Sequence, residues 1–108
     1  MNPEYLYYPD LAEQVDVPSG GIISRTLSND DHAKVVLFGF DTGQELSEHT
    51  SSMPAIIQVV SGEAELILGS DKMDARAGSW AFMQPELKHG IVAKSPLVMI
   101  LTMLKRSA

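Results

Sequence analysis

From residue 22 onward, short apolar segments alternate with clusters of turn-forming residues, which is the pattern of an all-β domain. One such cluster, Gly69-Ser70-Asp71, is a hairpin signal because glycine reaches positive φ without steric cost. No segment of useful length carries an apolar stripe at the helix period. The pattern predicts strands at residues 22–28, 34–41, 45–50, 55–60, 63–68, 72–76, 80–84, 90–93 and 97–104. So many strands in so short a stretch must close into a barrel or a two-sheet sandwich.

The beginning of the chain differs from this pattern, because it is polar and is interrupted by three prolines. One short helical turn is expected after Asp10, whose carboxylate can cap it, and the prolines keep it short. We therefore predict an N-terminal arm over residues 1–21 that packs on the barrel, and a single barrel domain over residues 22–108.

Two segments, residues 35–38 and 97–101, are apolar at every position, so their strands have no polar face. No helix is predicted that could cover such a sheet. We therefore expect a second copy of the chain to cover it, in a C2 homodimer with an apolar interface. The alternative is that the tyrosine-bearing arm covers that face within one monomer.

The composition excludes several classes of partner and site. Fourteen acidic residues against eight basic ones give a formal net charge of −6, which disfavours nucleic acid and anionic membranes as partners. The chain has no cysteine, so disulfides and thiolate metal sites are excluded and a reducing compartment is expected. The first residues lack the pattern of a secretory signal, and the apolar stretch 97–104 is too short to span a bilayer. We expect a cytoplasmic protein.

Two blocks bracketed by glycine each carry one histidine. The first runs from Gly43 through His49 to Gly62, and the second runs from Gly78 to His89. Neither block has a phosphate-binding character, because no helix is predicted to follow its glycines.

The alternation of side chains along a strand places some of these residues together. His49 and Ser51 are two positions apart, so their side chains point to the same face of a strand. Ala55, Ile57 and Val59 likewise share one face of the next strand. If His49 faces the interior, these residues form a small, apolar lumen wall with one hydroxyl.

The two blocks resemble the two signature motifs of the cupins, which are small proteins with a double-stranded β-helix fold. The bracketing glycines and the two histidines have the motif spacing, and the resemblance covers residues 37–104. In the second motif, Gln84 and Glu86 replace the usual proline and glycine. The resemblance implies a jelly-roll-like cupin barrel with a short N-terminal arm. It also implies that His89 faces the same cavity as His49.

The resemblance implies an incomplete set of metal ligands. Of the four usual ligand positions, two hold His49 and His89, while Ser51 and Ala55 occupy the positions of the second histidine and the glutamate. Two imidazoles alone bind a divalent ion weakly, with water completing the coordination shell. The expectation is therefore either no cofactor or a weakly bound Zn, Fe, Mn or Ni ion at His49 and His89. His32 is a candidate third ligand if its end of the barrel folds inward.

Candidate ligand contacts combine the lumen residues with nearby aromatic and sulfur-bearing side chains. Trp80, Phe82 and Met53 either line a pocket for a planar or hydrophobic ligand or belong to the core. The two histidines either contact a ligand or form hydrogen bonds across the barrel mouth. The predicted ligand-binding residues are His49, Ser51, Met53, Ile57, Trp80, Phe82 and His89, and no catalytic residue is assigned.

The leading functional hypothesis is the binding of a small molecule in the barrel lumen, without a tightly held metal. Two alternatives stay open. The family resemblance implies a metal-dependent enzyme of the dioxygenase, isomerase or decarboxylase type that uses His49 and His89. A sensory or partner-binding module without catalytic activity is the third possibility. The sequence leaves enzymatic activity undecided.

Overall fold

The computed structural model of the chain describes residues 3–105. Residues 1–2 of the predicted arm and residues 106–108 of the predicted barrel lie outside the described residues. A short 3-10 helix at Leu11–Gln14 begins where Asp10 caps it, with the backbone N–H of Ala12 donating to the Asp10 carboxylate at 3.1 Å. The strands are β1 Ile22–Asn29, β2 Ala33–Phe40, β3 Glu45–His49, β4 Ala55–Ser61, β5 Glu63–Leu68, β6 Asp71–Arg76, β7 Trp80–Met83, β8 His89–Ala93 and β9 Leu97–Leu104. Every predicted strand is present, with ends that agree to within one residue.

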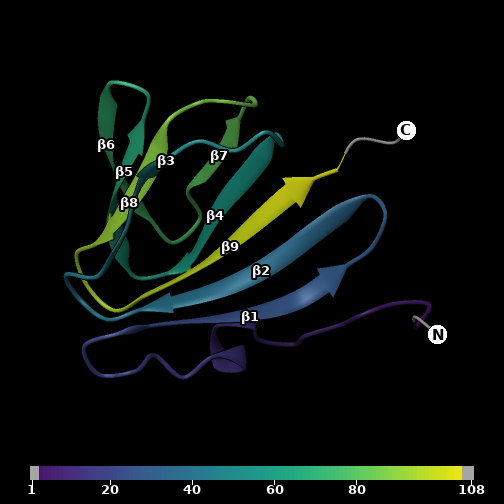
Figure 1. Cartoon of the computed structure of the whole chain (residues 1–108). Helices are drawn as coiled ribbons and strands as arrows, with labels where there is room; N and C mark the ends of the chain where they lie inside the picture. The colour runs from purple at the N-terminus through teal and green to yellow at the C-terminus, as the bar shows by residue number, and fades with distance from the viewer. Residues whose placement is uncertain (1–2, 106–108) are drawn as a thin grey trace.

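The strands form two facing sheets (Figure 1). One sheet has five strands in the order β1-β2-β9-β4-β7, and the other has four in the order β3-β8-β5-β6. All paired strands are antiparallel, and the chain crosses between the sheets repeatedly. This arrangement is a double-stranded β-helix, so the predicted all-β fold class is confirmed.

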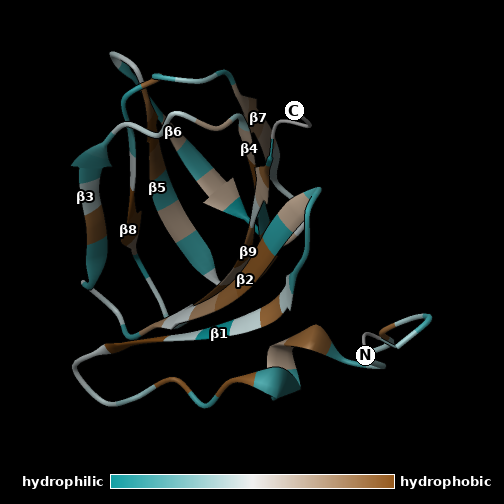
Figure 2. Ribbon diagram, turned by 45° about the vertical axis from the view of Figure 1, so that its right-hand side comes forward, coloured by the Kyte–Doolittle hydropathy of each residue, from teal (hydrophilic) through white to brown (hydrophobic). Residues whose placement is uncertain are grey.

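The main core lies between the two sheets, where the apolar faces of both meet. Phe40 of β2 and Leu97 of β9 are fully buried there, opposite Leu66 of β5 and Ile91 of β8. Figure 2 shows the hydrophobic colouring concentrated along β2 and β9. These strands carry the apolar segments predicted to lack a polar face, and their alternate residues do point into two different clusters.

The second cluster lies on the outer face of the five-stranded sheet. Val15 of the arm packs there with Leu37 of β2 and Val98 of β9, and Val17 packs beside them. Both views show the arm on the side of this sheet that faces away from the four-stranded sheet (Figures 1 and 2). Gly39 makes room for this contact, because a side chain at that position would press against both valines. The arm therefore covers part of the outer face.

Two of the three tyrosines of the arm do not cover the sheet. Tyr5 and Tyr7 are 79% and 76% exposed, whereas Tyr8 lies 5.7 Å from the guanidinium of Arg25 on β1. The covering of the outer face thus comes mainly from the two valines that follow the helical turn, Val15 and Val17.

One tight connection leads from the five-stranded sheet to the four-stranded sheet. Gly62 joins β4 to β5 with a φ of 88°. A Cβ at this position would clash with the carbonyl oxygen of Pro96. The glycine that ends the first motif is therefore required by a close approach of two backbones.

Among residues 3–105, no helix is long and apolar enough to cross a membrane.

Candidate functional site

The two motif histidines lie side by side at the end of the barrel where β3 stops and β8 starts. His49 and His89 are direct partners in the antiparallel β3–β8 register. Their ring centroids are 4.4 Å apart, and the rings are tilted by 55°. His89 is buried at 6% exposure, whereas His49 is exposed. The motif spacing predicted that the two rings come close together, and the structure places them in contact.

Each imidazole is oriented by its own strand. The Nδ1 atom of His49 lies 2.7 Å from the carbonyl oxygen of Ser47, and Nδ1 of His89 lies 2.9 Å from that of Leu87. A carbonyl oxygen only accepts, so both Nδ1 atoms carry the proton and donate it. In a neutral ring the other nitrogen is then an acceptor. Both Nε2 atoms therefore present lone pairs.

Neither Nε2 atom has a hydrogen-bond partner among residues 3–105. No buried polar side-chain atom in the same part of the chain is left without a partner. The Nε2 atom of His89 is therefore reachable from solvent although its ring is mostly buried. Both imidazoles can accept a hydrogen bond from a bound molecule or bind a cation.

The surroundings of the pair are apolar on the inside and charged on the outside. His89 pairs with Leu68 of β5, and this cross-strand pair continues the inward face that includes Ile91. Glu48 points away, as alternation predicts, and lies 4.0 Å from the ammonium of Lys88. The carboxylate next to His49 in the sequence is thus not part of the pair.

The two other positions of the family's ligand set have structural roles here. Ala55 is 3% exposed and packs in the main core. The Ser51 hydroxyl accepts a hydrogen bond from the backbone N–H of Met53 at 3.2 Å. Ala55 carries no metal-donor atom, and a serine hydroxyl is not among the usual protein ligands of zinc. The residues present therefore do not fit a metal centre with three or four protein ligands.

The rest of the described chain does not supply the missing ligands. Among residues 3–105, no three His, Asp or Glu side chains come together as metal ligands would. His32, the candidate third ligand, lies in the turn before β2 and does not join His49 and His89. The assignment of His49 and His89 to a weak metal site stays a prediction.

The turn before His89 keeps the backbone of a glycine without having one. Glu86 has a φ of 69°, and it is the only non-glycine residue with positive φ among those described. It occupies the glycine position of the second motif. Its backbone N–H donates to the carbonyl oxygen of Ser51 at 2.7 Å. This bond ties the second motif to the first and helps to set the position of His89.

An apolar cavity opens between β6 and β7. Its volume is about 450 Å³. β6 and β7 follow one another in the chain but are the edge strands of different sheets, so no hydrogen-bond ladder closes the gap between them. The cavity is lined from four strands by Ile57, Val59, Leu66, Leu68, Met73, Asp74, Ala75, Ser79, Trp80, Ala81 and Phe82.

Apart from Ser51, whose hydroxyl binds the backbone N–H of Met53, the predicted ligand-binding residues lie in three separate places. Ile57, Trp80 and Phe82 line the apolar cavity. The two histidines form the imidazole pair. Met53 lies elsewhere, in a surface hollow with Pro54 and Pro85.

Trp80 and Phe82 border the cavity from its outer side. They pair with Gln58 and Ile56 of β4, whereas the intervening Ala81 pairs with the lumen residue Ile57. Their rings are therefore on the outer face of the five-stranded sheet, 60% and 42% exposed. Neither ring belongs to the core. The alternative that Trp80 and Phe82 are core residues is therefore wrong.

Solved structures decide which fold family the chain resembles. A conserved protein of unknown function from Streptococcus pyogenes is 27% identical, with a TM-score of 0.87, over 100% of this chain and 95% of that chain. A cupin superfamily protein from Desulfitobacterium hafniense is 22% identical, with a TM-score of 0.86, over 96% and 94% of the two chains. An RmlC-like cupin from Shewanella frigidimarina is 24% identical, with a TM-score of 0.80, over 96% and 93%. The chain has the fold of the cupin superfamily.

The resemblance predicted from the two glycine-bracketed motifs is thus confirmed at the level of the fold. No family model matches the sequence of this cupin-fold chain, and no curated protein matches it either. The fold alone does not assign an activity, because one barrel hosts many unrelated chemistries.

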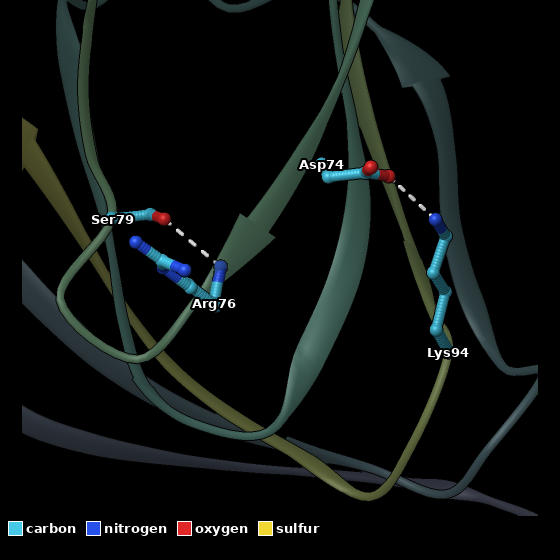
Figure 3. A network of polar contacts seen from close by, with 4 residues as sticks. All are labelled: Asp74, Arg76, Ser79 and Lys94. Atoms are coloured by element: carbon cyan, nitrogen blue, oxygen red, sulfur yellow. Dashed lines mark hydrogen bonds and ion pairs between the residues drawn. The ribbon is translucent and has the colours of Figure 1, made fainter.

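A charged hollow adjoins the apolar cavity of the cupin barrel. Its volume is about 510 Å³, and it shares Asp74, Ala75 and Ser79 with the cavity. Lys94 donates to the Asp74 carboxylate at 2.5 Å (Figure 3). This hydrogen bond and the attraction between the two opposite charges lower the pKa of Asp74 and raise the pKa of Lys94. Both groups are exposed, so their pairing contributes little to stability.

Sequence reasoning missed the wall of the cavity that the β5–β6 hairpin provides. Leu66, Leu68 and Met73 point inward from this hairpin and line the cavity. The available signal was the alternation of apolar and polar residues along 63–68, which marks Leu66 and Leu68 as inward-facing once the hairpin is recognised.

Proposed function

We propose that this cupin-fold protein binds a small, mostly apolar molecule in the cavity between β6 and β7, without a tightly held metal. The observation that carries the proposal is the cavity itself, with a volume of about 450 Å³. Ligand sites are typically clefts of about 300–1,000 Å³ lined mainly by apolar side chains with a few polar groups. This cavity has that composition, with Asp74 and Ser79 as its polar groups.

The strands around the cavity favour a ligand site over a packing defect. Ile57 and Val59 are almost fully buried at its floor, while Met73, Trp80 and Phe82 remain exposed at its mouth. An apolar ligand that enters removes this exposed apolar surface from water, which stabilises the complex by about 25 cal/mol for each Å² buried.

A cavity-filling variant tests the proposal. Ala81 faces the lumen and lines the cavity, so Ala81→Phe should occupy the space that a ligand needs. Ala77, in the turn after β6, is exposed and does not line the cavity, so Ala77→Phe is the matched control. We expect toluene to raise the Tm of the wild type and of the control, because a ligand selective for the native state stabilises it by mass action. An equal Tm rise in Ala81→Phe would contradict the proposal.

The second candidate is a metal-dependent enzyme, and the specific observation in its favour is the imidazole pair. His49 and His89 both present Nε2 lone pairs, with each ring held by a carbonyl oxygen at Nδ1. Such outer-shell hydrogen bonds are typical of metal-binding histidines. Elemental analysis of protein purified without chelator separates the two candidates. Stoichiometric metal that is lost in a His49→Ala/His89→Ala variant would favour the enzyme.

We also propose a homodimer that uses the outer face of the five-stranded sheet. The arm covers this face near Leu37 and Val98, but Trp80 and Phe82 at its β7 edge stay exposed. Exposed aromatic residues at an apolar face are typical of interfaces. Light scattering of Trp80→Lys tests this, and an unchanged dimer would argue against it. A partner-binding module, the third hypothesis, predicts instead that one other protein co-purifies in stoichiometric amount. The cytoplasmic location stays a prediction.

A further inference from the structure

We infer that the ligand in the cavity between β6 and β7 carries a carboxylate, and that Arg76 and Ser79 bind this group in the adjoining charged hollow. The inference rests on the proposed function, because it assigns the apolar body of the same ligand to the cavity. It goes further by assigning the charge of the ligand and by giving a role to two residues of the turn between β6 and β7.

The first argument is that the apolar cavity and the charged hollow adjoin one another. Asp74, Ala75 and Ser79 line both spaces, whose volumes are about 450 and 510 Å³. Arg76 lines only the hollow, whereas Trp80, one residue beyond Ser79, lines only the cavity. A molecule whose body lies against Trp80 can therefore place a polar head beside Ser79 and Arg76.

The second argument is that a closed turn holds Arg76 and Ser79 side by side. The backbone N–H of Ser79 donates to the carbonyl oxygen of Arg76 at 2.8 Å. The backbone N–H of Arg76 in turn donates to the hydroxyl oxygen of Ser79 at 2.9 Å. Figure 3 shows the Arg76 side chain on the side of Ser79, away from the Asp74–Lys94 pair. The turn therefore presents a guanidinium and a hydroxyl together.

The third argument is that both groups have protons to donate. No carboxylate among residues 3–105 forms an ion pair with the Arg76 guanidinium. The Ser79 hydroxyl accepts one hydrogen bond and still carries its own proton. The other cation of the hollow, Lys94, is already paired with Asp74. These donors favour an acceptor, and a carboxylate fits the guanidinium because its two oxygens match two parallel N–H groups.

The negative charges nearby favour a head group with a single charge. Glu63 is the cross-strand partner of Arg76 on β5 and also lines the hollow. Together with Asp74 and the net charge of −6, it repels a dianion such as a phosphate more strongly than a monoanion. Because Glu63 also competes for Arg76, the carboxylate of the ligand gains only the modest free energy of an exposed ion pair.

Three probes with one benzyl body test the inference. Toluene has no polar head, phenylacetate carries a carboxylate, and benzylammonium carries a positive charge. Calorimetric titration of the full chain should show phenylacetate binding about two- to fivefold more tightly than toluene, which is the gain from one exposed ion pair. Benzylammonium should bind no more tightly than toluene, and tighter binding would overturn the inference.

Charge-removing variants at three exposed positions show whether Arg76 causes the preference. In Arg76→Gln the preference for phenylacetate over toluene should disappear while toluene still binds. Lys72→Gln removes the same charge from the same strand, at a residue that lines neither space. It is the matched control and should keep the preference. Glu63→Gln should strengthen phenylacetate binding by about twofold, because it removes the competing carboxylate.

The outcomes separate this inference from the proposed function. If toluene binds and phenylacetate binds no more tightly, the inference is overturned and the apolar site stands. The same holds if Arg76→Gln keeps the preference, or if Lys72→Gln loses it equally, since the overall charge and not Arg76 would then be the cause. If neither toluene nor phenylacetate binds, the proposed function fails and the inference fails with it.

Discussion

Two regions of the barrel differ in how their strands are joined: the end that carries His49 and His89 (the imidazole end), and the gap between β6 and β7 (the cavity edge). At the imidazole end, β3 and β8 are hydrogen-bonded neighbours, and each ring is held by a carbonyl oxygen of its own strand. At the cavity edge, β6 and β7 belong to different sheets, and apolar side chains surround an open space. Strand pairing at the imidazole end fixes the orientation of the two rings, while the missing pairing between β6 and β7 leaves room for a cavity.

This division also explains the residues that replace the family's metal ligands. Ser51 and Ala55 lie between the two histidine positions in the motif pattern, yet one binds a backbone N–H and the other packs in the core. Both positions serve packing and turn geometry. The two imidazoles are therefore the polar groups at the imidazole end of the barrel.

The largest effect is expected at the floor of the cavity. Ile57→Ala should lower the free energy of unfolding by about 2–5 kcal/mol, because it removes a buried side chain and enlarges an existing cavity. Ile67 lies on the outward face of β5 and is only half-buried, so Ile67→Ala is the matched control and should cost less. Urea denaturation measures both. Equal losses would remove the distinction between a packed floor and a solvated outer face.

The imidazole end should accept a metal once its missing ligands are restored. Ser51→His/Ala55→Glu should increase zinc affinity by about a hundredfold or more, since even outer-shell ligand partners change metal affinity by 10- to 100-fold. The control pair Ser52→His/Ala55→Glu places the new histidine on an exposed neighbour. Zinc titration followed by Tm measures the gain. An equal gain in the control would show that residue 51 does not lie beside the imidazoles.

The two histidines should differ in their contribution to stability. His89 is buried, so His89→Ala should cost about 1–3 kcal/mol by removing a hydrogen bond and leaving the Leu87 carbonyl without its partner. His49 is exposed, and His49→Ala should cost less than about 1 kcal/mol. Chemical denaturation gives both values. A larger loss for His49→Ala would reverse the assignment of His89 as the buried member.

The smallest effect is expected at the turn that joins the two motifs. A non-glycine residue in the left-handed region costs about 1–2 kcal/mol, part of which glycine returns as entropy in the unfolded chain. Glu86→Gly should therefore raise the stability by up to about 1 kcal/mol. Gln84→Gly, at a position without positive φ, should lower it. A loss of stability in Glu86→Gly would mean that its side chain, and not its backbone, holds the turn.

The strands were predictable because their signals are local. Along 63–66 the inward and outward residues alternate in polarity, and glycine or proline marks the turns between most strands. The approach of His49 and His89 was predictable only through the spacing of the two motifs. Local alternation does not determine which strands become neighbours across the barrel.

The orientation of Trp80 and Phe82 was not predictable from the sequence. Every residue from 80 to 83 is apolar, so the period of two gives no sign of which side faces the lumen. The register with β4 decides it, because Ala81 pairs with Ile57. The cavity escaped prediction for a similar reason, since it forms where two strands that follow one another in the chain do not pair.

The most direct test of the apolar site is a titration of isotope-labelled protein with toluene, followed through the backbone amide signals in NMR. Binding between β6 and β7 predicts saturable shifts centred on Val59, Leu66 and Ala81, which line the cavity from three strands. The amides near Tyr5 and Tyr7, which are exposed on the arm, should stay unchanged. Shifts centred on the arm, or no saturable shift at all, would contradict a ligand site in the barrel.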